Sequence, residues 1–390
     1  MKLDQIQSQL LRQNLDGWLL FDHHHRDPLA YHVLGFEPTQ HVTRRWYYLI
    51  PAQGVPRKLV HRIESKILEP VAGDTRVYSS WGEQADELKH LLSNCQRVAM
   101  QYSPNCAIPY VSMVDAGTVE LIRSMNVEVV TSAELIQFFE ARLDQQGLDS
   151  HLLAGRLVDR IRAEAFAFIG ESLREKRIVC EWDVAEFVRH RFQEENLITE
   201  SGPIVAANEH AADPHYEPQS SGSSVIHSGD LVLLDMWAKL DAPSAVYYDI
   251  TWTGYCGDII PAEIARVFDV VREARDAAIH RVQEAFSQGT GLQGYEVDDA
   301  ARNSIRKAGF GDRFVHRTGH SIGVEVHGNG ANMDNLETHD TRVVMPWSCF
   351  SIEPGVYLDR FGIRSEVNIF IDENLPRVTG EIQREMIPIV

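Results

Sequence analysis

The stretch from Leu231 to Tyr255 reads LVLLDMWAKLDAPSAVYYDITWTGY, and it decides the fold of the second half of the chain. Two apolar, aromatic runs are separated by a turn-rich segment, which predicts two strands with a loop between them. Asp235 follows four apolar residues in the first strand, where a bare carboxylate would be costly. Something must therefore neutralise it.

The second strand carries its polar residues on one face. Side chains two positions apart in a strand share a face, so Asp249, Thr251 and Thr253 project together from an otherwise apolar run. One polar face in an apolar strand indicates a site. Each aspartate taken alone is equally well explained as a strand-end or turn carboxylate that meets solvent.

Two further carboxylates follow the same pattern near the C-terminus. FSIEPG (350–355) puts Glu353 at the end of an apolar strand, and GIRSEVNIFI (362–371) puts Glu366 within one, two positions after Arg364. Arg364 and Glu366 then share a face, and a structural ion pair explains any one such neighbour. Four semi-buried strand carboxylates in one domain favour a functional site.

The segment HRTGHSIGVEVHG (316–328) supplies imidazoles. His316, His320 and His327 are spaced by glycines that permit close backbone approach, and imidazole is the commonest nitrogen ligand for a divalent metal. A single histidine in a glycine-rich loop is more often solvated, but three in one short segment weaken that explanation. Upstream, AADPHYEP sets His215 in a Pro-flanked loop, from which it could project over the same site.

The length of 390 residues suits two domains at roughly 150 residues each. Short apolar runs alternate with helical stretches in the first third, and helical spacing continues from Leu135 to Leu173. Beyond Gly202, strands and helices are mixed without regular βαβ alternation. We predict an N-terminal α/β domain over 1–150 and an α+β catalytic domain with a largely antiparallel sheet over 151–390.

Composition excludes several classes of partner. Hydrophobic residues make up 44% and charged residues 24%, with no apolar run of about 18 residues, so we expect no membrane partner. The N-terminal stretch is amphipathic and lacks the apolar core of a secretory signal, so we expect a cytoplasmic protein. Five scattered cysteines argue against disulfides and a thiolate zinc site. A charge of −19 argues against nucleic acid.

The ordered carboxylates and histidines, with HxxGHxxGxxxH and EPG between them, resemble the ligand set of the pita-bread metallopeptidases, in their prolidase and aminopeptidase P branch. The resemblance covers roughly residues 200–371 by motif, and the preceding α/β domain also resembles the N-terminal domain of these enzymes. It implies a pita-bread catalytic domain and metal-dependent peptide hydrolysis.

Carried over by position, the resemblance implies a ligand set for two divalent ions, with bridging by Asp249 and Glu366, chelation of one ion by Asp235, and binding of the other by His320 and Glu353. It implies substrate-side histidines at His215, His316 and His327. The gap between Asp235 and Asp249 is longer than is usual in the family. A longer loop in AKLDAPSA absorbs the extra residues, and Asp241 in that loop is the weaker candidate because KLDAPS does not match the family motif.

Two adjacent divalent ions can supply a nucleophile at neutral pH and a Lewis acid together. Oxygen-rich ligation with one imidazole favours manganese, with cobalt or zinc as the next choices. Glu353 is the best-placed proton shuttle, and His215 and His327 could donate to a developing oxyanion. Arg364 could hold a substrate carboxylate or position a ligand.

The resemblance implies a small peptide substrate with proline in the second position. An Xaa-Pro dipeptidase (prolidase) is our first prediction, and an Xaa-Pro aminopeptidase of the aminopeptidase P type is the alternative, because the sequence does not separate them. A non-catalytic binding module of the same fold is less favoured, since retained carboxylates would repel one another without metal.

The resemblance also implies a homodimer, in which a loop of the N-terminal domain closes over the partner's active site. The segment FDHHHRDPLAYHVLG (21–35), with His23, His24, His25 and Tyr31, lies where that loop would fall. A solvated surface loop explains the same residues, and three consecutive histidines do not by themselves make a metal geometry. We therefore predict no metal ligand there.

Overall fold

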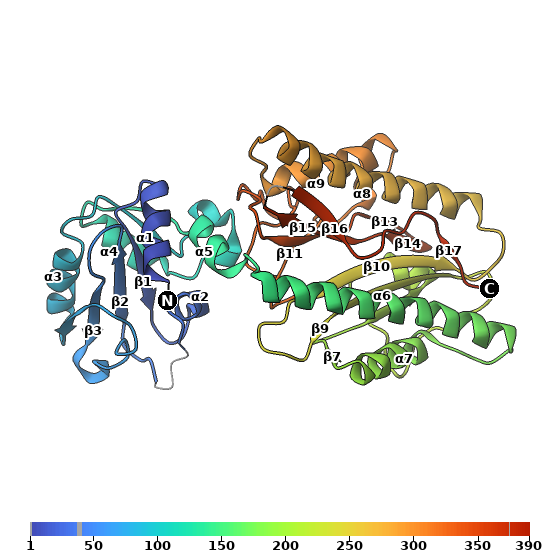
Figure 1. Cartoon of the computed structure of the whole chain (residues 1–390), viewed down its shortest axis with the longest axis horizontal. Coiled ribbons are helices and arrows are strands. Elements are labelled where there is room, and N and C mark those ends of the chain that lie inside the picture. Colours follow the sequence, from blue (N-terminus) through green and yellow to red (C-terminus); the bar gives the residue numbers. More distant parts are fainter. Residues whose placement is uncertain (1, 37–40, 374) are drawn as a thin grey trace. The chain divides into compact units, whose positions relative to one another are not determined.

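The computed structural model describes residues 2–36, 41–373 and 375–390, and it divides into two compact units, Met1–Glu140 and Ala141–Val390 (Figure 1). The predicted boundary near Ser150 falls instead inside α6 (Gln145–Arg174), because the apolar positions of this helix continue through it without a break. The predicted helical connection is also two separate helices, since α5 (Ala133–Glu140) belongs to the first unit and α6 to the second.

The first unit is the predicted α/β domain. Its mixed sheet has the order β4-β3-β2-β1-β5-β6. The strands are β1 (Gly17–Asp22), β2 (Trp46–Pro51), β3 (Arg57–His61), β4 (Asp74–Tyr78), β5 (Arg97–Met100) and β6 (Glu128–Thr131). The helices besides α5 are α1 (Leu3–Arg12), α2 (Pro28–Leu34), α3 (Trp81–Leu91) and α4 (Ala116–Arg123), with short 3₁₀ turns at Arg62–Glu64, Pro104–Cys106 and Pro109–Val111. The amphipathic pattern of α1 buries Ile6 and Leu10, as expected for its spacing.

The second unit is α+β and mainly antiparallel, as predicted. One sheet contains β7 (Leu197–Ile198), β8 (Ile204–Ala207), β9 (Leu231–Leu240), β10 (Tyr248–Tyr255) and β17 (Ile387–Pro388). Another contains β11 (Ser321–Ile322), β12 (Cys349–Ile352), β15 (Val367–Asp372) and β16 (Leu375–Thr379), and β13 (Gly355–Leu358) pairs with β14 (Phe361–Arg364). The long antiparallel pair β9–β10 spans the stretch Leu231–Tyr255, and its loop contains Asp241.

Helices cover these strands on two sides. Figure 1 shows α8 (Ala262–Gln288) and α9 (Gly294–Lys307) on one side and α6 with α7 (Glu181–Glu194) on the other. Short 3₁₀ turns also occur at Asn208–Ala212 and Gly311–Arg313. Since α6 packs against β9 and β10, these two long strands are largely buried, which explains their apolar runs.

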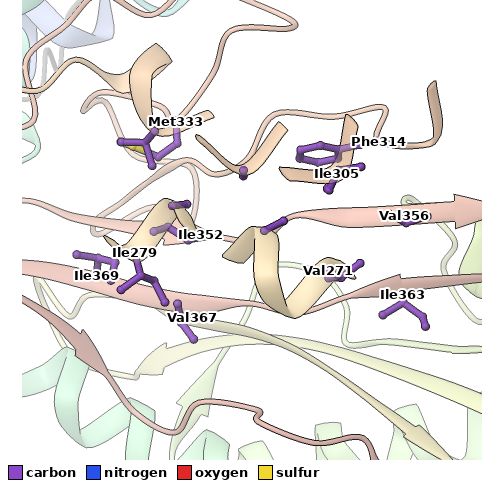
Figure 2. Close-up of a cluster of buried hydrophobic side chains, with 14 of the residues drawn as sticks. Val271, Ile279, Ile305, Phe314, Met333, Ile352, Val356, Ile363, Val367 and Ile369 are labelled. Carbon is purple, nitrogen blue, oxygen red and sulfur yellow. The ribbon is translucent and has the colours of Figure 1, made fainter. Parts of the chain in front are cut away.

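The core beneath α8 and α9 fixes the strands that carry the C-terminal carboxylates. In Figure 2, Ile279 of α8 lies beside Ile352 at the end of β12 and beside Val367 and Ile369 of β15. Burial of each such side chain stabilises the fold by about 1.5–3 kcal/mol. The segments before and after these anchors are therefore held on a rigid base.

Candidate metal centre

The two strand aspartates lie on one face of the β9–β10 pair. The register places Asp235 opposite Thr251, and Asp249 lies two positions from Thr251 on the same face. Both aspartates are buried, so the alternative reading as solvent-facing carboxylates is wrong. The predicted polar face also forms: Thr251 Oγ1 donates to Glu366 Oε2 at 3.0 Å, and Thr253 Oγ1 donates to the carbonyl oxygen of Arg364 at 3.1 Å.

Glu366 reaches this face from a connection rather than from within a strand. The prediction put Glu366 inside an apolar strand, but β14 ends at Arg364 and β15 begins at Val367. The chain leaves one pairing partner and joins another there, because β14 pairs with β13 and β15 pairs with β12. The backbone N–H of Glu366 donates to the carbonyl oxygen of Thr251 at 3.0 Å, which fixes the glutamate beside β10.

Asp249, His320 and Glu366 converge on one point, with one possible ligand atom from each lying within 4.8 Å of the others. His320 Nε2 lies 3.5 Å from Asp249 Oδ2 and 3.4 Å from Glu353 Oε1. Asp249 Oδ1 and Glu366 Oε1 are buried and accept no hydrogen bond from the described residues. Buried carboxylate oxygens without a partner are very costly, so this donor set fits bound cations.

The tautomer of His320 follows from its second nitrogen. His320 Nδ1 lies 3.2 Å from the carbonyl oxygen of Ser321, which can only accept a hydrogen bond. Nδ1 therefore carries the proton and Nε2 directs its lone pair at the carboxylates, as a metal ligand requires. The backbone before it is held closely against Ser351, because a Cβ on Gly319 would lie 1.9 Å from the Ser351 carbonyl oxygen.

Arg364 pairs with Asp235. Its Nη2 donates to Asp235 Oδ2, its Nε donates to Thr251 Oγ1 at 2.9 Å, and its Nη1 donates to Tyr357 Oη at 2.9 Å. Although Arg364 and Glu366 lie on the same side, Thr251 stands between them as a shared partner. Arg364 thus fixes one oxygen of Asp235.

The carboxylates of the cluster repel one another. Burial, followed by neighbouring carboxylates, raises the pKa of Asp249 and Glu366 well above the usual range, and burial also raises the pKa of Glu353. These shifts describe the protein chain by itself, and a divalent cation among the oxygens would reverse them. The cluster is therefore electrostatically incomplete without positive charge.

The predicted substrate-side histidines differ in their surroundings. His316 is held at both nitrogens, with Nδ1 2.7 Å from the carbonyl oxygen of Arg317 and Nε2 2.7 Å from Tyr357 Oη, and burial lowers its pKa to about 3. His327 is exposed, and its ring packs edge-on against His320 with centroids 4.4 Å apart. His215 is exposed on the loop before β9. His316 therefore supports Tyr357, whereas His215 and His327 face the open site.

All the predicted ligands and catalytic residues line one cavity of about 720 Å³. The sequence interpretation did not identify several other lining residues, including Arg317, Val326 and Glu337. It also missed Tyr357, which joins His316 to Arg364. Its position four residues after Glu353 in EPGVY was the available signal.

The triple-histidine segment is an ordered loop in the first unit. Asp22 accepts hydrogen bonds from the backbone N–H groups of His25, Arg26 and Asp27, and from Tyr31 Oη at 2.6 Å. The aspartate thereby closes the chain around itself in the manner of an Asx turn. Tyr31 is buried, so it anchors this loop from inside its own unit.

Comparison with known sequences gives the family. The sequence model of metallopeptidase family M24 matches residues 150–373. The chain belongs to metallopeptidase family M24. Enzymes of family M24 depend on a dinuclear metal centre, and the cluster around Asp249 is where this chain can hold metal. In the described residues, no helix is both long and apolar enough to cross a membrane.

Relatives of this M24 peptidase include dipeptidases. A probable dipeptidase, PepE, from Mycobacterium tuberculosis is 26% identical over 330 residues, covering 84% of this chain and 80% of the relative. An Xaa-Pro dipeptidase from Pyrococcus furiosus is 30% identical over 186 residues, covering 47% of this chain and 48% of the relative.

Solved structures show the same pita-bread fold. The dipeptidase PepE from Mycobacterium ulcerans matches with a TM-score of 0.69 at 22% identity, covering 100% of this chain and 97% of that one. The prolidase from Pyrococcus horikoshii matches with a TM-score of 0.60 at 21% identity, with 99% coverage of both chains. The predicted fold class is therefore confirmed.

Proposed function

We propose that this M24 peptidase hydrolyses Xaa-Pro peptide bonds, with Xaa-Pro dipeptides as its substrates. The observation that carries the proposal is the convergence of carboxylates and one imidazole around two buried carboxylate oxygens, Asp249 Oδ1 and Glu366 Oε1, that lack a hydrogen-bond partner in the described structure. Relatives named as Xaa-Pro dipeptidases support the dipeptide as substrate.

The proposed ligands of two divalent ions are Asp235, Asp249, His320, Glu353 and Glu366. Manganese is the first choice because the donors are mostly carboxylate oxygens, and cobalt or zinc comes next. Arg364 holds Oδ2 of Asp235, so Oδ1 is the oxygen that would bind an ion. When bound, the two ions supply a nucleophile at neutral pH and a Lewis acid for the scissile carbonyl group.

The remaining roles fall to side chains at the cavity wall. Glu353 lines the cavity beside His320, so its carboxylate is placed to accept the proton of the attacking water and to donate it later. His215 and His327 line the open side and can donate to the oxygen that becomes negative as the peptide bond breaks. Arg364 orients Asp235, and the Tyr357 hydroxyl group in turn holds the guanidinium of Arg364.

We also propose a homodimer and a cytoplasmic location, on the basis of the family resemblance and of the sequence. In this proposal His23, His24 and His25 are the residues of the first unit that approach the partner's site, whereas the buried Tyr31 supports their loop. Light scattering of the purified protein tests the dimer, and cell fractionation tests the location.

The decisive experiment combines metal content with substrate choice. Chelator-treated protein is reloaded with manganese, cobalt or zinc and is given an Xaa-Pro dipeptide, an Xaa-Pro-Xaa tripeptide and a dipeptide without proline. Metal-dependent cleavage of the Xaa-Pro dipeptide alone is the expected result. Cleavage of the tripeptide would indicate the alternative, an Xaa-Pro aminopeptidase, the activity for which a relative from Mycoplasma genitalium is named.

Two other outcomes overturn different parts of the proposal. Two bound ions per chain without cleavage of a proline peptide would keep the metal centre and discard the proline specificity. A chain that binds no metal would favour a non-catalytic binding module.

A further inference from the structure

The imidazole of His215 makes no hydrogen bond or ion pair within the described part of the chain, although it lines the cavity of the metal centre. Its backbone N–H is held by Asp213 Oδ1 at 3.0 Å. The direction of the ring is therefore set by the backbone of its loop, and whatever fixes that loop also places the ring.

The loop is tied to one buried carboxylate, that of Glu181 at the start of α7. Glu181 Oε1 accepts from the backbone N–H of Ala207 at 2.7 Å, and Oε2 accepts from the backbone N–H of Ser224 at 2.8 Å. These two residues lie before and after the segment 208–223. A single side chain that is fully buried thus closes the base of the loop.

Two side chains inside the loop reach the same carboxylate. Tyr216 Oη donates to Glu181 Oε2 at 2.6 Å, and His210 Nδ1 lies 2.8 Å from Oε1. The rings of His210 and Tyr216 stack with centroids 4.2 Å apart. Burial and Glu181 raise the pKa of Tyr216, so its hydroxyl stays protonated and keeps donating. Tyr216 directly follows His215, so this anchor acts next to the ring.

The chemistry requires a carboxylate rather than an amide. An ionised carboxylate only accepts, and here its two oxygens face four donors. A glutamine at this position would turn an NH₂ group toward two of them. The loop has little room to shift in response, because a Cβ on Gly362 in β14 would lie 1.9 Å from the carbonyl oxygen of Ala211 in the loop.

We propose that Glu181 is a positioning residue, whose carboxylate holds the loop 208–223 and thereby aims His215 at the substrate in the metal centre. This inference rests on the proposed function for the role of His215. Glu181 lies outside the cavity lining and touches neither the metal ligands nor the substrate, so its effect passes through His215.

The test is a double-mutant cycle with Glu181→Gln and His215→Ala on the metal-loaded full chain. Glu181→Gln should lower kcat/KM about 10–100-fold, because misplacement of a site group by about 1 Å costs on that order. In the His215→Ala background the same change should cost less than about threefold, since the group it aims is gone. Metal content should stay at the wild-type level. An equal loss in both backgrounds would overturn the inference.

A second measurement does not depend on activity. Hydrogen exchange of backbone amides in 208–223 should speed up in Glu181→Gln, and unchanged exchange there would contradict the anchor. Glu186→Gln, on the same helix but solvent-exposed, is the matched control and should change neither exchange nor turnover. If Glu181→Gln does not fold, Tyr216→Phe removes a single hydrogen bond and enters the same cycle. If the metal-loaded wild type cleaves no peptide, the proposed function is wrong. The hydrogen-exchange result still tests whether Glu181 holds the loop 208–223.

Discussion

Two kinds of buried carboxylate occur in the second unit, and they differ in their hydrogen bonds rather than in their burial. Asp298 on α9 is fully buried. It accepts hydrogen bonds from the backbone N–H and the hydroxyl group of Thr318 at 2.9 and 2.7 Å, and from Nε and Nη2 of Arg302 at 2.7 and 2.8 Å. Asp249 and Glu366 are also buried, but each keeps one oxygen that no described group satisfies.

This difference separates structural carboxylates from candidate metal ligands. Asp298 and Glu181 hold the segments that carry His320 and His215, and their charges are balanced by donors of the protein itself. The charges of Asp249 and Glu366 are balanced only if a cation is supplied from outside. Burial alone would have placed all four in one class.

Removing a carboxylate of the metal centre should give the largest effect. Asp249→Asn or Glu366→Gln should abolish metal binding at one or both positions and lower hydrolysis roughly 10³-fold or more, because nucleophile and Lewis acid are lost together. Elemental analysis and peptide hydrolysis measure this. In chelator the free energy of unfolding should stay equal or rise, since like charges are removed.

The control for that experiment is Asp241→Asn, in the exposed loop between β9 and β10, which should leave metal content and turnover unchanged. Full activity of Asp249→Asn would refute its assignment as a ligand.

Replacing a carboxylate whose hydrogen bonds are all made within the protein should instead lower the free energy of unfolding. Asp298→Asn should lower the free energy of unfolding by about 3–5 kcal/mol, because it leaves the buried Arg302 without its counter-charge. Urea unfolding of the chelator-treated protein gives the value from its midpoint. Asp299→Asn, which loses little because its amide can still accept from Asn335, is the matched control. A loss below about 1 kcal/mol would show that the pair is not a structural clamp.

Replacing the exposed His327 should slow turnover without changing the metal content. His327→Ala should retain both ions and slow turnover about 10²-fold, the usual cost of removing one donor to a developing oxyanion. Elemental analysis beside kcat separates the two effects. His280→Ala, on the exposed face of α8, serves as the control. Loss of metal in His327→Ala would make that residue a ligand.

Asp27 in the first unit has an unsatisfied buried oxygen but is not a candidate metal ligand. Its Oδ2 is buried without a partner, yet the described residues around it form no metal-binding group, and burial raises its pKa to about 7. A carboxyl whose pKa is higher in the folded state loses its contribution to stability as the pH rises through that value. We therefore expect the first unit of the wild type to lose stability as the pH rises from about 4, near the pKa of an aspartate in an unfolded chain, to about 7.

Asp27→Asn should remove that pH dependence. The asparagine can still cap α2 by accepting from the backbone N–H of Ala30, as Asp27 does. At pH 8 the variant should be more stable than the wild type by on the order of 4 kcal/mol, and at pH 4 nearly equal. Thermal unfolding at both pH values measures the difference. If the difference in stability between the variant and the wild type does not change with pH, Asp27 does not titrate in this range.

The sequence predicts the strand carboxylates well because their signal is local. A charged residue within or directly after an apolar run, as at Asp235 and Asp249, identifies a buried polar group without knowledge of the fold. The prediction that Glu366 lies within a strand is wrong because a local signal does not reveal strand partners. The break between β14 and β15 arises because the two strands pair with different partners, and it leaves no breaker residue in RSEVN.

What the sequence cannot predict depends on distant contacts. Arg364 pairs with Asp235 across 129 positions, although its near neighbour Glu366 was the obvious partner. Glu181 opens an ordinary amphipathic helix, and only the return of the chain at Ala207 and Ser224 shows what it binds. The boundary between the two units also depends on distant contacts. The apolar pattern of α6 is continuous, and only the contacts of the folded chain show that this helix belongs to the second unit.

The wide spacing of the proposed ligands also bears on how the protein acquires its centre during folding. Asp249 comes from β10, whereas His320 and Glu366 are placed beside it by the pairing of β12 with β15 and by backbone hydrogen bonds to Ser351 and Thr251. Contacts between such distant segments form late, since closing long loops is entropically unfavourable. A nascent or partly folded chain therefore offers no assembled centre, and metal uptake would report that the second unit has completed its fold.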